Sequence, residues 1–559
     1  MKPRPTCGSV AALCVAFCAL TSSLGAQVTT APRANGIAED WSQHTIVFSR
    51  DALARRPDVL YREPRVLHQV MERWQAPEWG VLPEVEGSAG GSGEPLGISG
   101  KRVGPERDWN ISLGSARMGQ HVFPAKYSFD PAAPPDCIND YVLYGLSLPG
   151  TTAGQANLVA FNNLYVNGAG TGACAGTTPS VMFAYNISAN GGKIATSPIL
   201  SLDGTKAGFV ESGTGAVPFS TFHVLTWTAG QGTVTSAAAP AAMLSVPLSA
   251  TANCTTSAPW IDFANDTVYV ADDSGILYKI TGVFNGTPTL AASPWPLTIV
   301  AGNHLSPPVL DSVLGKLMVG AQNGNLYQID VASGTVGTVP LPVGTGATTS
   351  GIVAPPVVDI TNGTTFVVSA NDGTSAVLVE ADTATLTQIT KAAIGKGSSG
   401  GTALRLYEPA FSNDYYSDPS TGVIRLCGTS SGDTSPWQYA FGFSGRTMNT
   451  SSSFSASLLT STAARCTGWT EFFNPNVGVP PGTDYFFFGL TQDCTGTGTA
   501  FGCVAEITTG NTTPLTATVS GGPSGIVIDN YSTALGASSL YLSAEGANLA
   551  YKFTQVGLQ

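Results

Sequence analysis

Three stretches of the chain share one pattern of apolar and polar positions: 259–280, 308–330 and 356–382. Each begins with a proline and contains three short apolar runs, with turn-forming Gly, Asn, Asp or Ser between them. In the first stretch, the second run places Val268 and Val270 two residues apart, which is the period of a β-strand. The pattern predicts a meander of three strands joined by tight turns, followed by a looser fourth strand.

The copies recur at a nearly constant interval, since Pro259, Pro308 and Pro356 are 49 and 48 residues apart. A repeat of this length indicates a solenoid, a propeller or a domain array. Weaker copies extend the series in both directions, at 125–186, 197–227, 408–445, 471–508 and 524–555. The chain therefore contains eight candidate units.

A four-stranded unit cannot bury both of its faces alone, whereas closing the array into a ring buries them. The sequence therefore predicts an all-β fold, a β-propeller of eight four-stranded blades over residues 106–559. Seven blades is the alternative, because the units that begin near residues 408 and 471 are degenerate. The last unit has no fourth strand before Gln559, so we expect residues 108–114 (DWNISLG) to supply it and close the ring.

The chain ahead of residue 106 has a different composition. Residues 1–26 indicate a secretory signal peptide, because a basic start precedes an apolar run too short to span a membrane. Residues 27–84 are predicted to form a helical N-terminal extension, since apolar positions from Val66 to Trp74 fall on one helix face. That face either docks on the main domain or binds a partner. The Gly- and Ser-rich segment 85–105 is predicted to be a flexible linker.

The copies at 259–280 and 308–330 resemble the SPVVxDGxVYVGSxDGxLYALD blade of PQQ-like propellers. Over most of its length the chain also resembles a group of uncharacterised secreted bacterial propeller proteins, through segments 40–49, 124–130, 195–204, 471–476 and 525–543. The resemblance implies a propeller fold and export, but no activity. It also implies no bound quinone, because the tryptophan-docking repeats of quinoprotein dehydrogenases do not occur in regular form.

Charge and hydropathy argue against nucleic acid as a partner of the chain and against a membrane span. Only 11% of the residues are charged and the net charge is −12, so the basic face that nucleic-acid binding needs is missing. No run beyond the signal peptide approaches the ~20 apolar residues of a membrane-spanning helix. We expect a monomer that is secreted or resides in the periplasm or cell envelope.

Seven cysteines follow the signal peptide. In an oxidising compartment disulfides are expected, and the odd number leaves at least one thiol over. Cys494 and Cys503 flank a short Gly/Thr loop and are the favoured pair, and Cys137 with Cys174 is the second choice. Metal binding by these cysteines is disfavoured, because there is no C-x-x-C motif and no adjacent histidine.

Asp272 and Asp273 form the most acidic point of the clearest copy. Their counterparts in the other copies are Asn-Gly and Asp-Gly, which favour hairpin turns. The alternating oxygen ligands of a calcium loop are missing. We therefore expect a turn and no cofactor, with calcium as the disfavoured alternative.

Four residues are candidates for ligand binding: Asp262, Asp311, Asp359 and His304. The three aspartates recur once per unit, and the simplest interpretation is that each caps its first turn by accepting backbone N–H bonds. Alternatively, they form a ring of carboxylates around the channel that binds a cation or a basic ligand. His304 precedes Ser-Pro-Pro in a loop that leads into a unit.

No catalytic residue is assigned. The Gly-x-Ser-x-Gly matches at 397–401 and 428–432 lack the strand–turn–helix context of a hydrolase. We favour a non-catalytic binding or scaffold protein whose loops bind a protein, a glycan or a small ligand. The alternative is an extracellular propeller enzyme (a lyase, glycosidase or cofactor-dependent dehydrogenase) with its site at the central channel. A convergent cluster of Asp, Glu, His, Arg or Tyr at one channel mouth discriminates between the two.

Overall fold

The computed structural model describes residues 36–48, 63–66, 69, 104–130, 133–150, 152, 154–344, 351–398, 404–474, 482–494, 501–509, 511–530, 532, 534 and 536–555. These residues belong to one compact unit that begins at Gly36. The predicted signal peptide lies outside the described residues, as do most of the predicted N-terminal helix and most of the predicted linker.

Eight sheets of four or five strands make up the unit, and each sheet is one blade. Blade 1 contains β1 (Ile37–Glu39), β4 (Ala125–Ser128), β5 (Tyr141–Gly145), β6 (Leu158–Asn162) and β7 (Ser180–Tyr185). Blade 2 contains β8 (Lys193–Ile194), β9 (Ile199–Leu200), β10 (Lys206–Ser212), β11 (Ser220–Thr226) and β12 (Met243–Ser249). Blade 3 contains β13 (Trp260–Asp262), β14 (Thr267–Ala271), β15 (Ile276–Thr281), β16 (Thr289–Leu290) and β17 (Leu297–Thr298). Blade 4 contains β18 (Val309–Asp311), β19 (Lys316–Gly320), β20 (Asn325–Asp330), β21 (Thr335–Val336) and β22 (Leu341–Pro342).

The second half of the ring follows the same plan. Blade 5 contains β2 (Ile46–Val47), β23 (Val357–Asp359), β24 (Thr364–Asp372), β25 (Ser375–Asp382) and β26 (Gln388–Lys396). Blade 6 contains β27 (Ala410–Phe411), β28 (Val423–Thr429), β29 (Pro436–Ser444), β30 (Thr447–Met448) and β31 (Phe454–Ser457), with the short helices α5 (Asn413–Ser417) and η2 (Pro419–Thr421) between its first two strands. Blade 7 contains β32 (Thr470–Asn474), β33 (Thr483–Leu490), β34 (Phe501–Thr508) and β35 (Leu515–Ser520). Blade 8 contains β3 (Glu106–Ser112), β36 (Val527–Asp529), β37 (Ser539–Ser543) and β38 (Leu549–Thr554).

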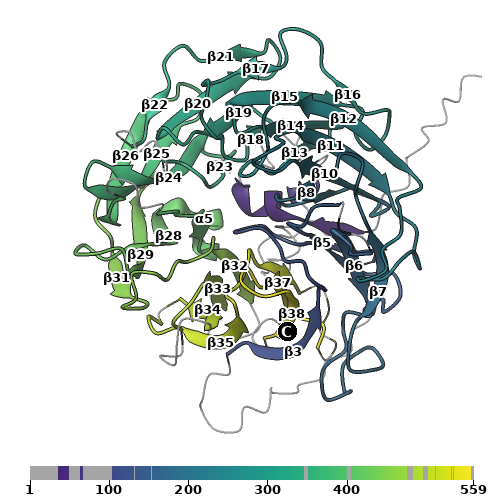
Figure 1. Cartoon of the computed structure of the whole chain (residues 1–559). Helices are drawn as coiled ribbons and strands as arrows, with labels where there is room; N and C mark the ends of the chain where they lie inside the picture. Colours follow the sequence, from purple (N-terminus) through teal and green to yellow (C-terminus); the bar gives the residue numbers. More distant parts are fainter. Residues whose placement is uncertain are drawn as a thin grey trace, which may run out of the picture. The chain divides into compact units, whose positions relative to one another are not determined.

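The blades close into a ring around a central channel (Figure 1). Innermost strands of successive blades contact one another, and β36 of the last blade contacts β4 of the first. The predicted closing strand is also confirmed, because β3 pairs antiparallel with β38 and supplies the outer strand of blade 8. The fold is therefore an eight-bladed β-propeller, and the seven-blade alternative is wrong. Blade 8 thus combines a strand from the start of the ring with three from its end, which ties the two together.

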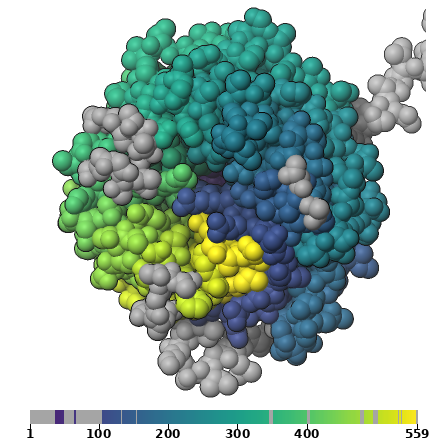
Figure 2. Space-filling view, viewed as in Figure 1, coloured from purple at the N-terminus to yellow at the C-terminus, as the bar shows by residue number. Residues whose placement is uncertain are grey.

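The segment before the ring contributes to two of its blades. β1 pairs antiparallel with β4 of blade 1, and β2 pairs parallel with β23 of blade 5. The 3₁₀ helix η1 (Trp41–Thr45) joins them. The space-filling view is hollowed near the centre of the ring, where a small part of this N-terminal segment is visible in purple (Figure 2). The sequence analysis did not anticipate these strands, because segments of two or three residues show no period of their own.

Arg65 fixes the returning N-terminal chain to blade 3. Its Nη2 donates to the Ile261 carbonyl oxygen at 2.8 Å, and its Nη1 lies 2.8 Å from Glu63 Oε1. The guanidinium lies 3.9 Å from the ring centroid of Trp260. Arg65 is 1% exposed, so its charge depends on these partners in place of water.

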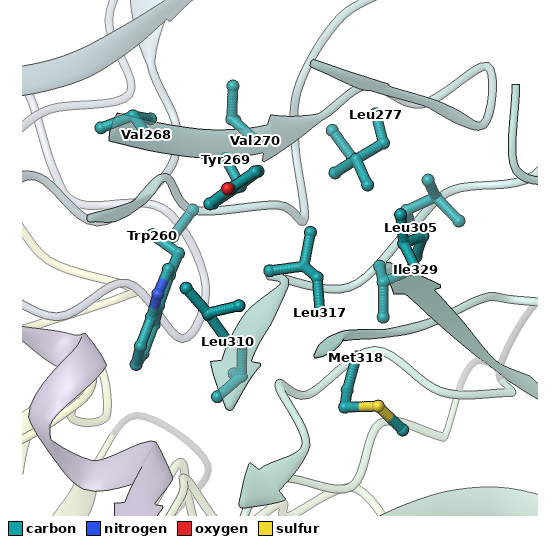
Figure 3. Close-up of a cluster of buried hydrophobic side chains, with 14 of the residues drawn as sticks. Trp260, Val268, Tyr269, Val270, Leu277, Leu305, Leu310, Leu317, Met318 and Ile329 are labelled. Carbon is teal, nitrogen blue, oxygen red and sulfur yellow. The ribbon is translucent and has the colours of Figure 1, made fainter. Parts of the chain in front are cut away.

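The hydrophobic core lies between neighbouring blades. Figure 3 shows the part between blades 3 and 4, where Val268 and Leu277 belong to one sheet and Leu310, Leu317 and Ile329 to the next. Each of these side chains is almost fully buried. Burial of such a side chain stabilises the fold by roughly 1.5–3 kcal/mol, so the packing of adjacent sheets holds the ring together.

Three disulfides are present among the described residues: Cys137–Cys174, Cys427–Cys466 and Cys494–Cys503. The first and third are the pairs favoured from the sequence, and the second links blade 6 to the loop that leads into blade 7. Cys254 is a free, buried thiol. Several disulfides are typical of proteins of an oxidising compartment. No helix in the described part of the chain has the length and hydropathy needed to cross a membrane.

Candidate functional site

A hollow of about 500 Å³ lies at one mouth of the central channel. Its walls come from inter-blade loops, each of which precedes an innermost strand, and the lining includes residues 120–123, 195–197, 255, 256, 258, 307, 353, 355, 405 and 407. Trp41 of η1 also lines it. Six blades and the N-terminal segment thus meet at one cavity, which is the usual place for a propeller site.

His121 and Glu408 form a hydrogen-bonded pair at this mouth. His121 Nε2 lies 3.1 Å from Glu408 Oε2, and the two side chains are only 10% and 1% exposed. Burial alone raises the pKa of Glu408, but the adjacent His121 more than offsets it, so that the pKa lies below its usual value. The carboxylate occupies space that only a glycine leaves open, since a Cβ on Gly468 would lie 2.1 Å from Glu408 Oε1. Glu408 is therefore ionised at neutral pH and holds the imidazole in place.

His121 is held in a backbone conformation that few residues adopt. Its φ is +57°, in the left-handed region, which costs roughly 1–2 kcal/mol for a residue with a side chain. The backbone N–H of His121 donates to Glu545 Oε1 at 2.6 Å. Its ring stacks on Tyr407 with the centroids 3.4 Å apart. Such strain persists only where surrounding contacts enforce it, and it is found most often at functional sites.

Three side chains that line the hollow keep a buried polar atom without a hydrogen-bond partner among the described residues: His121 Nδ1, Thr196 Oγ1 and Tyr407 Oη. Arg405 is close enough to Tyr407 to offset part of the rise in its pKa that burial causes, yet the two make no hydrogen bond of ordinary geometry. Buried polar atoms are nearly always paired. Three unpaired atoms around one hollow make it a candidate site for a polar ligand.

Basic side chains surround the hollow. Arg405 Nη1 donates to Gln120 Oε1 at 3.2 Å, and Arg117 and Arg465 lie nearby. Glu545 is the acidic group beside them; burial raises its pKa to about 7, although His121, Arg405 and Arg117 lower it in part. The mouth thus brings the arginines Arg405 and Arg117 close to the carboxyl groups of Glu408 and Glu545.

The three predicted aspartates lie at the other end of the innermost strands. The loop at Ala258 lines the hollow, whereas Asp262 ends strand β13, which follows that loop. Asp262 Oδ1 accepts from the backbone N–H groups of Ala264 and Asn265 at 3.1 and 3.3 Å. Asp311 and Asp359 accept corresponding bonds two and three residues on. The turn-capping interpretation is confirmed.

Two of these aspartates also face other carboxylates. Burial raises the pKa of Asp311 to about 6, and Asp359 adds to the rise. Burial likewise raises the pKa of Glu380 to about 7, with a smaller contribution from Asp359. Tyr415 Oη of α5 donates to Asp359 Oδ2 at 2.8 Å. At this end of the channel, burial disfavours the charged form of the carboxyl groups, which are held in a network of structural hydrogen bonds.

The turn interpretation of Asp272 is confirmed as well. Asp272 Oδ1 accepts from the backbone N–H groups of Ser274 and Ile276 at 2.9 and 3.0 Å. Gly275 has a φ of +88°, and a Cβ there would lie 1.8 Å from the carbonyl oxygen of Val300. Only glycine meets both conditions. Asp273 turns away to accept from Thr255.

His304 lies 3.3 Å from Asp273 through its Nδ1, and it is 42% exposed. It stands beside the mouth but not among the residues that line the hollow. Ligand binding by His304, Asp262, Asp311 and Asp359 stays a prediction, and the structure shows what these side chains contact instead. His223 is fully buried, with Nε2 3.0 Å from Glu211 Oε2 and Nδ1 2.8 Å from Ser245 Oγ.

The residues at the mouth were not predicted, although their positions relative to the prolines of the repeat could have indicated them. In the units concerned, the innermost strand is preceded by a proline, at 124, 198 and 409. Thr196 stands two residues before its proline, Tyr407 two before and His121 three before. Collecting the polar residues that precede each proline of the repeat brings His121, Thr196 and Tyr407 together.

Two further features considered in the sequence are metal ligation and the Gly-x-Ser-x-Gly matches. No three His, Cys, Asp or Glu side chains within the described ranges lie together as metal ligands. Ser399 of the first Gly-x-Ser-x-Gly match lies outside the described residues, and Ser430 of the second is in the turn between β28 and β29, where its hydroxyl accepts from Gly432. The Ser430 hydroxyl thus stabilises the turn in which it lies.

Comparison with known proteins adds no assignment to this picture. No protein-family model matches the sequence, and no curated protein matches it. Among solved structures the chain is similar to the Dos1 propeller, with a TM-score of 0.49 and 11% identity over 81% of this chain and 96% of that one. It is also similar to the dihydro-heme d1 dehydrogenase NirN, with a TM-score of 0.38 and 9% identity over 75% and 68% of the two chains.

A third similar structure is the quinohemoprotein alcohol dehydrogenase ADHIIG from Pseudomonas putida HK5, with a TM-score of 0.31 and 11% identity over 47% of this chain and 41% of that one. At such identities the likeness is one of fold, shared by proteins of different function. The class that fold and site define is an eight-bladed β-propeller with a polar cavity at its channel mouth.

Proposed function

We propose that the protein is a non-catalytic recognition module that binds a small polar ligand at the mouth of its central channel. The observation that carries this proposal is the set of unpaired buried atoms around one hollow: His121 Nδ1, Thr196 Oγ1 and Tyr407 Oη. Ligand sites are concave and mostly apolar, with a few placed polar groups. The hollow fits that description, since Trp41 and Phe123 also line it.

The position of the hollow favours a small ligand over a protein or a glycan chain. Loops that belong to six blades wall it on several sides, and small-molecule sites are recesses of this kind. Trp41 forms part of the wall, held by a hydrogen bond from Nε1 to the Pro259 carbonyl oxygen at 3.3 Å and by edge-on packing against Trp260.

An enzyme is the second candidate, and one observation favours it. His121 is oriented by Glu408 through Nε2 and has its other nitrogen at the hollow, which is the arrangement of a base held by a carboxylate. His, Arg, Tyr and Glu side chains also converge at the mouth. Such a cluster is the feature that we expect of an enzyme and not of a binding module. Recognition is preferred because the apolar lining and the hydroxyls of Thr196 and Tyr407 suffice for binding, whereas the pair of His121 and Glu408 alone defines no reaction.

A crystallographic fragment screen tests the proposal. Crystals soaked with small polar fragments are expected to show density in the hollow, with hydrogen bonds to Tyr407 and Thr196. Tyr407→Phe and Thr196→Val remove one hydroxyl each and keep the shape of the lining, so each is expected to weaken binding by about three- to tenfold. Fragments that bind only elsewhere, or with unchanged affinity in both variants, would contradict the proposal.

The same fragments separate the two candidate functions. Each fragment that binds is incubated with the protein and with His121→Asn, and the solution is followed by NMR. Recognition predicts unchanged fragment spectra in both samples. Conversion by the unmodified protein that is lost in His121→Asn would replace recognition by catalysis.

We further propose that the protein works outside the cytoplasm and is related to PQQ-like repeat propellers. The three disulfides support the compartment, together with the signal peptide predicted over residues 1–26. The blade sequences at 259–280 and 308–330 support the relationship. The relationship concerns the fold and includes no quinone.

A further inference from the structure

The polar groups at the mouth are mainly hydrogen-bond donors. Arg405 lines the hollow, donates to Gln120 Oε1 and forms no ion pair within the described residues. The hydroxyls of Thr196 and Tyr407 are free to donate. A guanidinium without a carboxylate partner, beside two free hydroxyls, presents a set of donors to whatever enters.

The acids near Arg405 are engaged elsewhere. Glu408 is paired with His121 at 3.1 Å. Glu545 accepts the backbone N–H of His121, and its pKa of about 7 leaves it only partly ionised at neutral pH. Arg117 adds a second positive charge near Glu545. Arg405 is therefore a cation at the hollow that no carboxylate pairs with among the described residues, and it favours an anion.

The rest of the lining is apolar and includes Trp41, Val122, Phe123, Pro307, Val353 and Pro355. A bare inorganic oxyanion gains nothing from such walls, whereas an organic body is desolvated by them. We propose that the ligand of the channel mouth is a small organic carboxylate, with its carboxylate on Arg405 and the hydroxyls of Tyr407 and Thr196, and its apolar body against Trp41 and Phe123. This inference rests on the proposed function.

Matched acids and amides test the ligand class directly. Isothermal titration calorimetry is run with benzoate against benzamide, with butanoate against butanamide, and with inorganic phosphate. The carboxylates are expected to bind at least about tenfold more tightly than their amides, because the charge-assisted bond to Arg405 is lost in the neutral partner. Phosphate is expected to bind more weakly than benzoate.

Variants then locate the anchor. Arg405→Gln is expected to lower benzoate affinity at least about tenfold. Arg405→Lys keeps the charge but not the planar fork, and it is expected to give an intermediate loss; it also serves if the Gln variant does not fold. Arg446→Gln is the matched control, since Arg446 is exposed in the outer turn of the same blade. Its affinity is expected to equal that of the unmodified protein.

Each remaining outcome decides the question. Amides that bind as tightly as the acids would overturn the carboxylate class and leave ligand binding at the mouth intact. Phosphate binding as tight as that of benzoate would overturn the organic body. Carboxylate binding that survives in Arg405→Gln would overturn the placement. If neither these probes nor any fragment of the crystallographic screen enters the hollow, both the ligand class and the proposed function fail.

Discussion

The two ends of the central channel are built on the same innermost strands, yet they treat polar groups differently. At one end Asp262, Asp311 and Asp359 recur from blade to blade and accept backbone N–H bonds in their own turns. At the other end His121 and Tyr407 occur once each. They keep an unpaired polar atom, as Asp311 Oδ2 does at the turn end, but they lie in loops that line the hollow. A polar residue that repeats with the blade maintains the blade, whereas one that departs from the repeat is available for recognition.

The largest effect is expected for a variant that tests whether the two ends are independent. The N-terminal segment links them, because it reaches both. Arg65→Ala removes the bonds to Ile261 and the contact with Trp260, and leaves Glu63 buried without its partner. We expect a loss of about 3–5 kcal/mol in the free energy of unfolding, measured by urea denaturation. Hydrogen exchange should also become faster in residues 36–48, which include Trp41 at the mouth.

Arg446→Ala, at an exposed arginine of an outer turn, is the control and is expected to leave stability unchanged. A loss in Arg65→Ala no greater than in this control would show that the segment is held by its short strands alone.

The next effect concerns pH and the turn end. Burial keeps Asp311 protonated in the folded protein up to a pKa of about 6, whereas the unfolded carboxyl ionises near pH 4. The folded state therefore holds the extra proton in this window, and the free energy of unfolding falls as pH rises from about 4 to 6. Two pKa units correspond to about 3 kcal/mol. Asp311→Asn keeps the capping oxygen, so it should be more stable than the unmodified protein at pH 7.5 and not at pH 4.

Asp203 is the matched control of opposite sign. Burial is the largest single influence and raises its pKa, but the hydrogen bonds from Ser201 and Thr205 together outweigh it and hold the pKa below its usual value. Its contribution is present at neutral pH and is lost as pH falls through the lowered pKa. Asp203→Asn should therefore reduce stability at pH 7.5. Thermal denaturation at the two pH values measures the stability of both variants. A change of stability of the same sign in both would contradict this explanation.

A smaller effect tests how tightly the mouth is built. Gly468→Ala would place a Cβ 2.1 Å from Glu408 Oε1 and push the carboxylate away from His121. Overpacking of this kind costs about 1–3 kcal/mol, which urea denaturation measures. Gly432→Ala is the control, since its Cβ would meet only Ser430 Oγ at 3.8 Å. Equal stabilities of the two variants would mean that Glu408 relaxes freely.

The ring was predictable because its signal is repeated. The proline, the apolar runs and the capping aspartate recur from 259 to 382, so each blade supports the assignment of the next. The closing strand followed from the missing strand of the last unit, and β3 supplies it. Cys494 and Cys503 were recognisable because nine residues separate them and the loop between them is short.

The site was not predictable in the same way. His121 and Glu408 are 287 residues apart and meet only because the ring brings the loops of blades 1 and 6 to one mouth. An alignment of repeats retains what the units share and discards such single residues. Strands β1 and β2 were missed for a related reason, since their pairing partners, and not their own residues, make them strands.

The smallest effect compares one tyrosine from each end. Tyr415 Oη donates to buried Asp359 at 2.8 Å, so Tyr415→Phe should cost about 1–2 kcal/mol. Tyr407 Oη is buried without a partner among the described residues, so Tyr407→Phe should leave stability unchanged or raise it by up to about 1 kcal/mol, because a group that was desolvated for nothing is removed. Both variants keep the ring, and urea denaturation measures both. Equal losses would show that Tyr407 has a structural partner in solution and would erase the difference between the ends. Opposite signs would identify Tyr407 as a residue retained at some expense of stability, as a residue kept for binding is expected to be.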